Sequence, residues 1–363
     1  MKNLFSIADH FTPSAKVTNI KPFGSGNIND TFLASLETPK ETHFVLQRIN
    51  TKVFRQPELV MSNICHFTEH VRKRLEKNPL NRRWEVPQVL LTKDSKNHFQ
   101  DTEGSFWRAI SYIENSQSFD IIHDGEHAKE IGYALGMFHN LISDLPPVNL
   151  ADTLEGFHIT PLYLQHYEEV LAKTSVQKNP EVNYCLQFIS DRSNWANILE
   201  DAKHKDILPL RLMHGDPKIN NVMFDAYTQK AIAVIDLDTV KPGLVHYDIG
   251  DCMRSGCNPA GEETEDLESV YFDPDLCQGI LQGYLSVAKA FLTDNDYNYI
   301  YDAIRLISFE LGLRFFADHL AGNLYFKVKN PHHNLARAMV QFKLTESIES
   351  QETTISQIIK DNK

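Results

Sequence analysis

The sequence predicts an α+β protein in which an antiparallel sheet with one main helix precedes a larger, mainly helical part. Strand-like segments separated by Gly, Pro, Asn or Asp turns dominate residues 16–112, whereas long helical periodicities dominate after residue 118. Because a sheet and a set of helices that follow one another along the chain form separate layers, we expect two parts, residues 1–114 and residues 115–363.

The first part contains five strand-like segments and one helix. We expect strands at residues 17–23, 28–36, 42–49, 85–91 and 105–113. A helix begins near Pro57 and interrupts them. Its apolar residues recur at spacings of one, three and four and therefore share one face: Leu59, Val60, Ile64, Phe67, Val71 and Leu75.

The second part is built mainly from helices, with one short island of strand and turn. Helical periodicity marks residues 127–142, 160–173 and 301–320. The island, residues 208–238, lies between the helical segments. It carries the most informative polar residues of the chain.

Composition and charge exclude several classes of protein. The 363 residues are 42% hydrophobic and 23% charged, which is typical of a folded globular chain. The net charge of −12 disfavours nucleic acid and membrane surfaces as partners, and an acidic chain would meet a nucleotide through bound cations. The five cysteines lack zinc-site spacing, and neither a signal peptide nor an apolar run of about 18 residues is present. We therefore expect a cytoplasmic protein with reduced cysteines.

The island places three oxygen-bearing side chains at one end of a small hairpin. An apolar strand leads into His214-Gly215-Asp216, Asn221 follows five residues after Asp216, and a second apolar strand ends at Asp236. Phosphoryl transfer uses a carboxylate to orient the attacking hydroxyl, and an amide with a second carboxylate to hold Mg²⁺. Any one of these residues alone is more often a turn or cap residue, but the joint spacing favours catalysis.

These motifs resemble those of the aminoglycoside phosphotransferase and choline kinase-like superfamily, small-molecule kinases with the two-lobed protein-kinase fold. The resemblance implies that Asp216 is the catalytic base, that Asn221 and Asp236 bind Mg²⁺, and that Lys218 lies beside the transferred phosphate of ATP. We interpret His214 as a structural residue that braces the loop, because no nucleophile needs it as a base.

The strand-rich part can be tested against this resemblance. Gly24, Ser25 and Gly26 lie between the first two expected strands, where a kinase covers the nucleotide phosphates with backbone N–H groups. The third strand departs from the kinase pattern, because Gln47 stands where the lysine is expected and Arg48 falls on the opposite strand face. Either Gln47 makes a neutral contact or a local bulge turns Arg48 inward. The hinge that binds adenine should lie within residues 106–114.

Within the superfamily, the chain is most similar to the N-acetylhexosamine 1-kinases. The similar stretches include PFGSGNINDTF, VLQRINT, VIDLDTVKPG and RFFADHLAGNLYFK, and the likeness runs from about residue 20 to residue 345. It implies that Thr239, Arg314 and Tyr325 contact the sugar near Asp216. Asn27 replaces a histidine that contacts the sugar in those enzymes. Without the resemblance, Arg314 could equally pair with Glu310 one helical turn earlier.

Three functions remain open at this point. The leading hypothesis is an ATP- and Mg²⁺-dependent kinase that phosphorylates the anomeric hydroxyl of an N-acetylhexosamine, with the sugar and the nucleotide as partners. The second keeps the kinase but changes the acceptor to a cationic compound such as an aminoglycoside or choline. The third is a nucleotide-binding pseudokinase, which the missing lysine permits but which Asp216, Asn221 and Asp236 argue against. Nothing in the sequence indicates an oligomeric state.

Overall fold

The computed structural model describes all residues except 1, 13–14, 25–27, 39–41 and 175–178. It consists of two compact units. The first, here called the sheet unit, comprises Met1–Gln117, Val148–Leu154 and Met223–Lys241; the second, the helical unit, comprises the rest. The expected division at residue 114 stays a prediction. Two later segments, Val148–Leu154 and Met223–Lys241, pack with the sheet unit and are counted in it.

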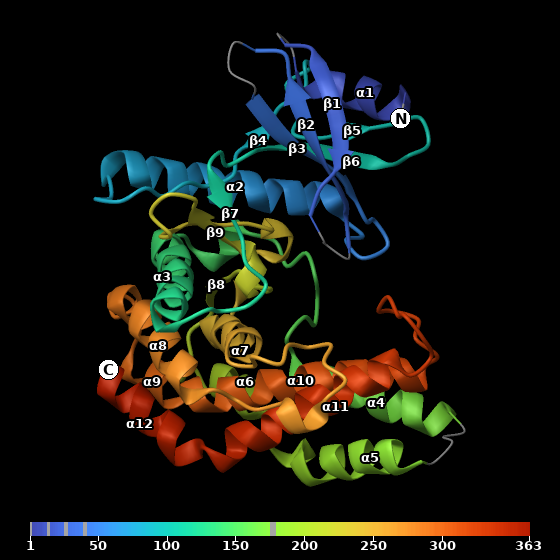
Figure 1. Ribbon diagram of the computed structural model, residues 1–363, viewed down its shortest axis with the longest axis vertical. Coiled ribbons are helices and arrows are strands. Elements are labelled where there is room, and N and C mark those ends of the chain that lie inside the picture. The colour runs from blue at the N-terminus through green and yellow to red at the C-terminus, as the bar shows by residue number, and fades with distance from the viewer. Residues whose placement is uncertain (1, 13–14, 25–27, 39–41, 175–178) are drawn as a thin grey trace. The chain divides into compact units, whose positions relative to one another are not determined.

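The sheet unit is built on a six-stranded sheet whose path follows the order β1, β2, β3, β6, β4, with β5 paired to β6 (Figure 1). Every pair is antiparallel. Four of the strands match expected segments, whereas the fourth expected segment forms only a two-residue strand. The strands are β1 (Val17–Pro22), β2 (Asp30–Leu36), β3 (Thr42–Ile49), β4 (Val89–Leu90), β5 (Phe99–Gln100) and β6 (Phe106–Ser111).

A short N-terminal helix covers one face of this sheet. Helix α1 (Lys2–Ala8) and the 3₁₀ turn η1 (Asp9–Phe11) bury Ile7 and Phe11 against strand residues such as Phe44 and Leu46. Phe44 and Leu46 alternate with more exposed neighbours along β3, as expected for a pleated strand. The alternation that predicted the strand therefore also builds its core.

Helix α2 (Pro57–Lys77) is the one long helix of the sheet unit. It buries Val60, Ile64 and Val71 as expected, but Leu59 is 37% exposed and does not belong to the buried face. Asn63 lies on the buried side, where its amide nitrogen donates to the carbonyls of Ala151 (2.8 Å) and Val240 (3.1 Å). These bonds join the two later segments of the sheet unit to α2.

The expected island folds into short strands and 3₁₀ turns on both sides of the boundary between the units. β9 pairs with β10 and with β7, where Asp225 lies opposite Ser116. β8 pairs with β11. The bounds are β7 (Ser116–Gln117), β8 (Arg211–Met213), η4 (Ile219–Asn221), β9 (Val222–Asp225), β10 (Ala231–Val234), η5 (Leu237–Thr239) and β11 (Lys241–Gly243).

The helical unit contains the remaining helices. The expected helices correspond to α3, α4 and α10. The full set is α3 (Gly125–Ile142), α4 (Thr160–Lys173), α5 (Pro180–Arg192), α6 (Ile198–His204), α7 (Val245–Gly256), α8 (Pro274–Ala288), α9 (Asp294–Asn298), α10 (Ile300–Leu320), α11 (His333–Ser350) and α12 (Glu352–Asn362), with 3₁₀ turns η2 (Pro147–Asn149, partly in the sheet unit), η3 (Ser193–Trp195) and η6 (Leu267–Ser269).

Two helix pairs organise this unit. Helices α3 and α8 approach so closely that a Cβ added at Gly283 would lie 1.8 Å from the Lys129 carbonyl oxygen, and one at Gly132 would lie 1.9 Å from that of Ile280. Helix α10 packs along α11 (Figure 1) and is apolar on nearly all sides, since Phe309, Leu313 and their neighbours are buried. A helix that is apolar all round belongs in a core.

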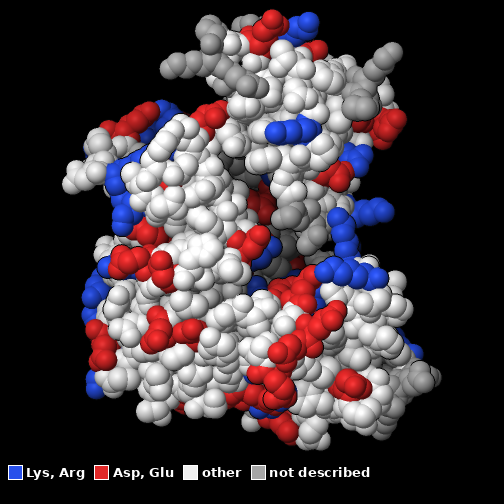
Figure 2. All heavy atoms as spheres, in the orientation of Figure 1, with Lys and Arg blue, Asp and Glu red and all other residues white. Residues whose placement is uncertain are grey.

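The surface carries a mixture of charges. On the face shown in Figure 2, lysine and arginine side chains stand in small groups among acidic ones, and no continuous basic surface forms from the residues described on that face. None of the described helices combines the length and apolarity that a membrane-spanning segment requires.

Candidate active site

The loop that follows β8 is held in place by a carboxylate from α7. Asp248 is fully buried, and its two oxygens accept the backbone N–H groups of His214 (2.6 Å) and Gly215 (2.8 Å). The same carboxylate contacts His139 Nε2 at 2.8 Å. Asp248 therefore anchors the loop. Loss of this acceptor would leave two buried N–H groups without a partner.

A buried histidine holds the same loop from the other side. His158 Nε2 lies 2.8 Å from the Gly215 carbonyl oxygen, and its Nδ1 lies 2.9 Å from Glu310 Oε1. Burial disfavours the charged ring, but the Glu310 carboxylate outweighs burial and raises the pKa of His158 above its usual value. A carbonyl and a carboxylate can only accept hydrogen bonds, so both ring nitrogens of His158 must donate, and the ring is an imidazolium. Gly215 itself has φ +89°, which favours glycine.

The backbone of Asp216 is fixed at both ends while its carboxylate stays accessible. Its N–H donates to His214 Nδ1 (3.2 Å), and its carbonyl accepts from Asn221 Nδ2 (2.8 Å). The side chain is 31% exposed, and Lys218 Nζ lies 2.9 Å from Asp216 Oδ2. The loop thus brings Asp216, Lys218 and Asn221 together, and His214 braces it as expected.

The predicted metal ligands divide between the units, Asn221 in the helical unit and Asp236 in the sheet unit. The amide nitrogen of Asn221 donates to the Asp216 carbonyl, and its expected contact with Mg²⁺ stays a prediction. Asp236 is exposed and has φ +63°, a conformation that is costly outside glycine and is concentrated at functional sites. Amide and carboxylate oxygens suit Mg²⁺, and no three described His, Cys, Asp or Glu side chains form a metal cluster on their own.

In the sheet unit, Gln47 bonds to side chains of neighbouring strands, and Arg48 lies on the other face of β3. Gln47 Nε2 donates to Thr31 Oγ1 at 3.1 Å. The expected alternative, a bulge that turns Arg48 inward, is wrong: the register of β3 with β2 and with β6 is continuous from Phe44 to Arg48. Arg48 remains on the other face, where its exposed side chain pairs with Asp30.

A cation that the sequence analysis missed lies next to Gln47. Arg108 is opposite Gln47 in the β3–β6 ladder, is 1% exposed, and donates from Nε to Gln47 Oε1 at 2.9 Å. Its Nη1 forms an ion pair with Asp238, which is 3% exposed and also accepts from Asn29 at 2.6 Å. The signal was present in the sequence, because Arg108 interrupts an otherwise apolar strand segment.

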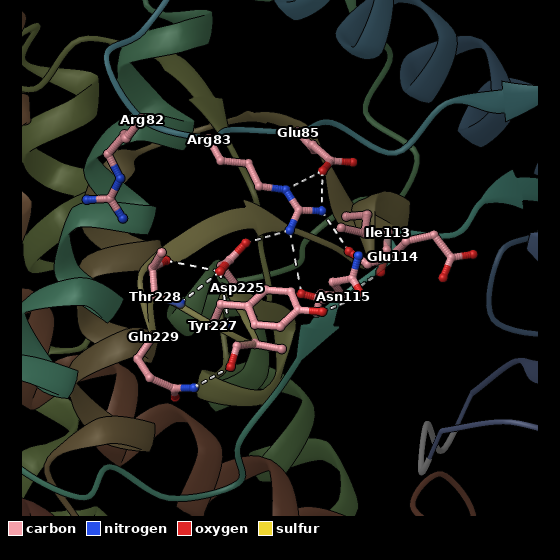
Figure 3. Close-up of polar contacts among 12 residues, drawn as sticks. Arg82, Arg83, Glu85, Ile113, Glu114, Asn115, Asp225, Tyr227, Thr228 and Gln229 are labelled. Carbon is pink, nitrogen blue, oxygen red and sulfur yellow. Dashed lines mark hydrogen bonds and ion pairs between the residues drawn. The ribbon is translucent and has the colours of Figure 1, made fainter.

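The segment expected to be the hinge is fixed by Arg83. Figure 3 shows the Arg83 guanidinium pointing at the segment after β6 and at the β9–β10 hairpin. It donates to the Glu114 carbonyl (2.7 Å) and to Asp225 Oδ2 (2.7 Å). Asp225 also accepts the backbone N–H groups of Tyr227 and Thr228. Hydrogen bonds from the backbone of Thr228, the side chain of Arg83 and the side chain of Thr228 lower the pKa of Asp225 to about 2.

The described residues that were expected to contact the acceptor lie in two places. Arg314 is 13% exposed, lies 4.0 Å from Glu310, and is surrounded by the rings of Tyr163, Phe157 and Phe326 at 4.9, 5.3 and 5.6 Å. Tyr325 belongs to the same neighbourhood and is 57% exposed. Thr239 ends η5 in the sheet unit.

The glycine turn is described only in part. Gly24 has φ +75° and has open space where a Cβ would stand. Ser25, Gly26 and Asn27 lie outside the described residues, so their expected contacts with phosphate and sugar stay predictions.

Solved structures with this fold are phosphotransferases and kinases. An aminoglycoside phosphotransferase from Alicyclobacillus acidocaldarius superposes with a TM-score of 0.64 at 12% identity, covering 98% of this chain and 96% of that one. An amicoumacin kinase in complex with AMP-PNP, Ca²⁺ and Ami gives 0.58 at 12% identity, with 96% and 93% covered. An ethanolamine kinase from Plasmodium vivax gives 0.54 at 12% identity, with 89% and 82% covered. The fold is therefore the protein-kinase-like α+β fold.

The fold and the loop around Asp216 define a class, the kinase-fold phosphotransferases. Residues 19–280 match the model of one family, described as the phosphotransferase enzyme family. This match spans more than half of the chain, and the protein belongs to that family.

Proposed function

We propose that the protein transfers the γ-phosphate of ATP to the anomeric hydroxyl of an N-acetylhexosamine, giving the sugar 1-phosphate. The observation that carries the proposal is the loop of Asp216. Four hydrogen bonds fix the backbone of this loop: Asp248 accepts two and His214 Nδ1 accepts one, while Asn221 donates the fourth. The Asp216 carboxylate nevertheless remains accessible. A positioned and accessible carboxylate is what an attacking hydroxyl requires.

In this mechanism each residue of the loop has a separate task. Asp216 orients the acceptor hydroxyl and accepts its proton as the hydroxyl oxygen bonds to the γ-phosphorus, while the bond from that phosphorus to the bridging oxygen breaks and ADP leaves. Lys218, whose ammonium lies 2.9 Å from Asp216, faces the negative charge of the transferred group. Asn221 and Asp236 would hold Mg²⁺, which supplies neutralisation of the nucleotide phosphates. Gly24 and its neighbours would cover those phosphates.

The surroundings of Arg314 favour a neutral acceptor over a cationic one. Burial disfavours its charge, but Tyr163, Glu310 and Tyr325 raise the pKa of Arg314, so the guanidinium stays charged. A fixed cation at the acceptor site repels an ammonium group, whereas a hydroxyl or an acetamido carbonyl accepts its hydrogen bonds. The similarity of the sequence to N-acetylhexosamine 1-kinases points in the same direction.

A panel of acceptors tests the proposal. ADP release is measured with ATP and Mg²⁺ in the presence of N-acetylglucosamine, N-acetylgalactosamine, choline, ethanolamine or kanamycin, and ³¹P NMR locates the phosphate in the product. We expect turnover with an acetamido sugar and an anomeric phosphate. Turnover of amines alone would instead establish the cationic acceptor, and nucleotide binding without any turnover would establish a pseudokinase.

A second measurement assigns the acceptor residue. We expect Arg314→Ala to raise the sugar KM more than the ATP KM. The matched control is Arg305→Ala on the same helix, whose guanidinium pairs with Asp302 and stacks over Trp195. Equal effects of the two variants on the sugar KM would exclude Arg314 from the acceptor site.

A further inference from the structure

A pocket of about 160 Å³ lies within the helical unit and has no function assigned to it so far. Its walls come from residues 120–122, residues 218–220, the end of α7 with the loop that follows it, and helices α8 and α11. Thr239, Arg314 and Tyr325 are not among the described residues that line it. The pocket is thus separate from the acceptor residues that the sequence indicated, although Lys218 forms part of its wall.

A buried amide in this pocket has no partner. Gln341, in the middle of α11, is 0% exposed and lines the pocket. Neither its amide nitrogen nor its amide oxygen has a hydrogen-bond partner among the described residues. Burying an unpaired amide is unfavourable, so a buried glutamine normally has partners in the protein, in water or in a ligand.

A second amide in the wall has a free acceptor. Asn258 is 5% exposed, and its amide nitrogen donates to the Gly261 carbonyl at 3.0 Å, which fixes the orientation of the side chain. Its amide oxygen has no partner among the residues described. The wall therefore offers one unused N–H₂ group and two unused carbonyl oxygens.

The two cationic side chains of the wall are already paired with carboxylates. Arg254 is 5% exposed and pairs with Asp251 (2.8 Å) and with Glu262 (3.2 Å). Lys218 pairs with Asp216 at 2.9 Å. Of the lining side chains, two are cationic and two, Asp120 and Glu262, are carboxylates. This balance favours neither an anion nor a cation as the occupant.

We propose that the pocket binds a small neutral molecule, or the neutral end of a larger one, that carries an amide or adjacent hydroxyl groups. Such a group accepts from the Gln341 amide nitrogen and donates to the oxygens of Gln341 or Asn258. Its apolar part packs against Ile122 and Leu276, which also line the pocket. The volume is close to that of a cavity of about 150 Å³ that holds benzene, so the occupant has the size of N-methylacetamide or glycerol.

The occupant can come from two sources, because an acceptor substrate and a separate small ligand share this chemistry. If it is one end of the acceptor, the inference rests on the proposed function, since Lys218 then lies between the pocket and Asp216. If it is a separate ligand, binding is independent of phosphoryl transfer. The experiment therefore measures binding first, without nucleotide, so that its failure and a failure of the proposed kinase activity are distinguishable.

The binding test uses N-methylacetamide and glycerol as probes, with acetate and tetramethylammonium as charged comparisons. Saturation-transfer NMR titrations are run on the full chain and on three variants. Gln341→Met removes the amide, Leu276→Phe fills the pocket without touching its polar groups, and Thr345→Val is the matched control. Thr345 is buried one turn along α11, does not line the pocket, and has its hydroxyl bonded to the Gln341 carbonyl.

We expect saturable binding of a neutral probe to the wild type and to Thr345→Val, and at least a tenfold weaker affinity in Gln341→Met and in Leu276→Phe. If Gln341→Met fails to fold, Leu276→Phe carries the test. Absence of saturable binding to the wild type, or equal binding to the wild type and both pocket variants, would overturn the proposal and leave the pocket as a site for water alone.

Enzyme kinetics then separate the two sources. A rise of the acceptor KM in Leu276→Phe, with an unchanged ATP KM, supports an acceptor that reaches into the pocket. An unchanged acceptor KM together with lost probe binding supports a separate ligand.

Discussion

The ion pair between Arg108 and Asp238 should be the most sensitive polar contact of the sheet unit. Both side chains are almost completely buried, at 1% and 3% exposure, and they join β6 to the turn η5 that follows Asp236. Removing one partner of a buried pair leaves the other charge without compensation, which typically costs 3–5 kcal/mol. We therefore expect Arg108→Met to lower the free energy of unfolding by about 4 kcal/mol.

The size of this effect depends on how much compensation each variant retains. After Arg108→Met, Asp238 keeps only the hydrogen bond from Asn29 at 2.6 Å among the contacts described above. After Asp238→Asn, the guanidinium keeps the bond to Gln47 at 2.9 Å. The double variant removes both charges, so its cost should fall at least about 2 kcal/mol below the sum of the single costs.

Urea unfolding followed by circular dichroism and by tryptophan fluorescence measures these costs, with Trp107 as a probe in the core of the sheet unit. Arg48→Met is the control, because Arg48 and its partner Asp30 are about half exposed and such pairs contribute at most about 1 kcal/mol. Strictly additive costs for Arg108→Met and Asp238→Asn, or a cost for Arg48→Met as large as for Arg108→Met, would refute the reasoning.

Three further predictions concern the helical unit. Gly283→Ala should lower the unfolding free energy by about 1–3 kcal/mol, because the added Cβ would collide with the Lys129 carbonyl. The control Gly125→Ala has open space at its Cβ and should cost far less. Equal midpoints of thermal unfolding for the two variants would contradict this prediction. Asp248→Asn should lower kcat about tenfold or more while the nucleotide Kd stays unchanged, because the backbone N–H groups of the loop lose one of their two carboxylate acceptors. A normal kcat would exclude the anchoring role of Asp248. The folded state holds the pKa of His158 above its unfolded value of about 6.5. The charged ring therefore stabilises the folded state fully below the unfolded pKa, and this contribution is lost as the pH rises through the folded pKa. The unfolding free energy of wild type minus that of His158→Gln should therefore fall as the pH rises above about 6.5. A constant difference would show that His158 is neutral in the fold.

Local pattern predicted the larger elements because each depends on residues close in sequence. The alternation in β3 and the periodicity of α2 are of this kind. The prediction that Leu59 is buried was wrong, because an apolar residue near the start of α2 can fit the periodicity although no other element covers it. The division of the chain into units depends instead on long-range pairing, since Asp225 pairs with Ser116 and Asn63 binds Ala151.

The candidate site shows the same distinction. The spacing from His214 to Asn221 is short, so the sequence could predict that these residues share a loop. The role of Arg108 was missed because it comes from two partners that are distant in the sequence. Gln47, opposite it in the sheet, lies 61 residues earlier, and Asp238, in the turn η5, lies much later. His158 was missed because it holds Gly215 from a segment 57 residues away. Only a folded structure brings such groups together.

The central claim is that Asp216 carries the transfer of phosphate from ATP. The most direct test compares the wild type with Asp216→Asn in a single-turnover measurement of ADP formation, with ATP, Mg²⁺ and the best acceptor of the panel, beside a separate measurement of the ATP Kd. We expect the transfer rate to fall about 10²-fold or more, as for loss of a positioned base, while the Kd stays within about twofold. A near-normal transfer rate in Asp216→Asn would contradict the assignment.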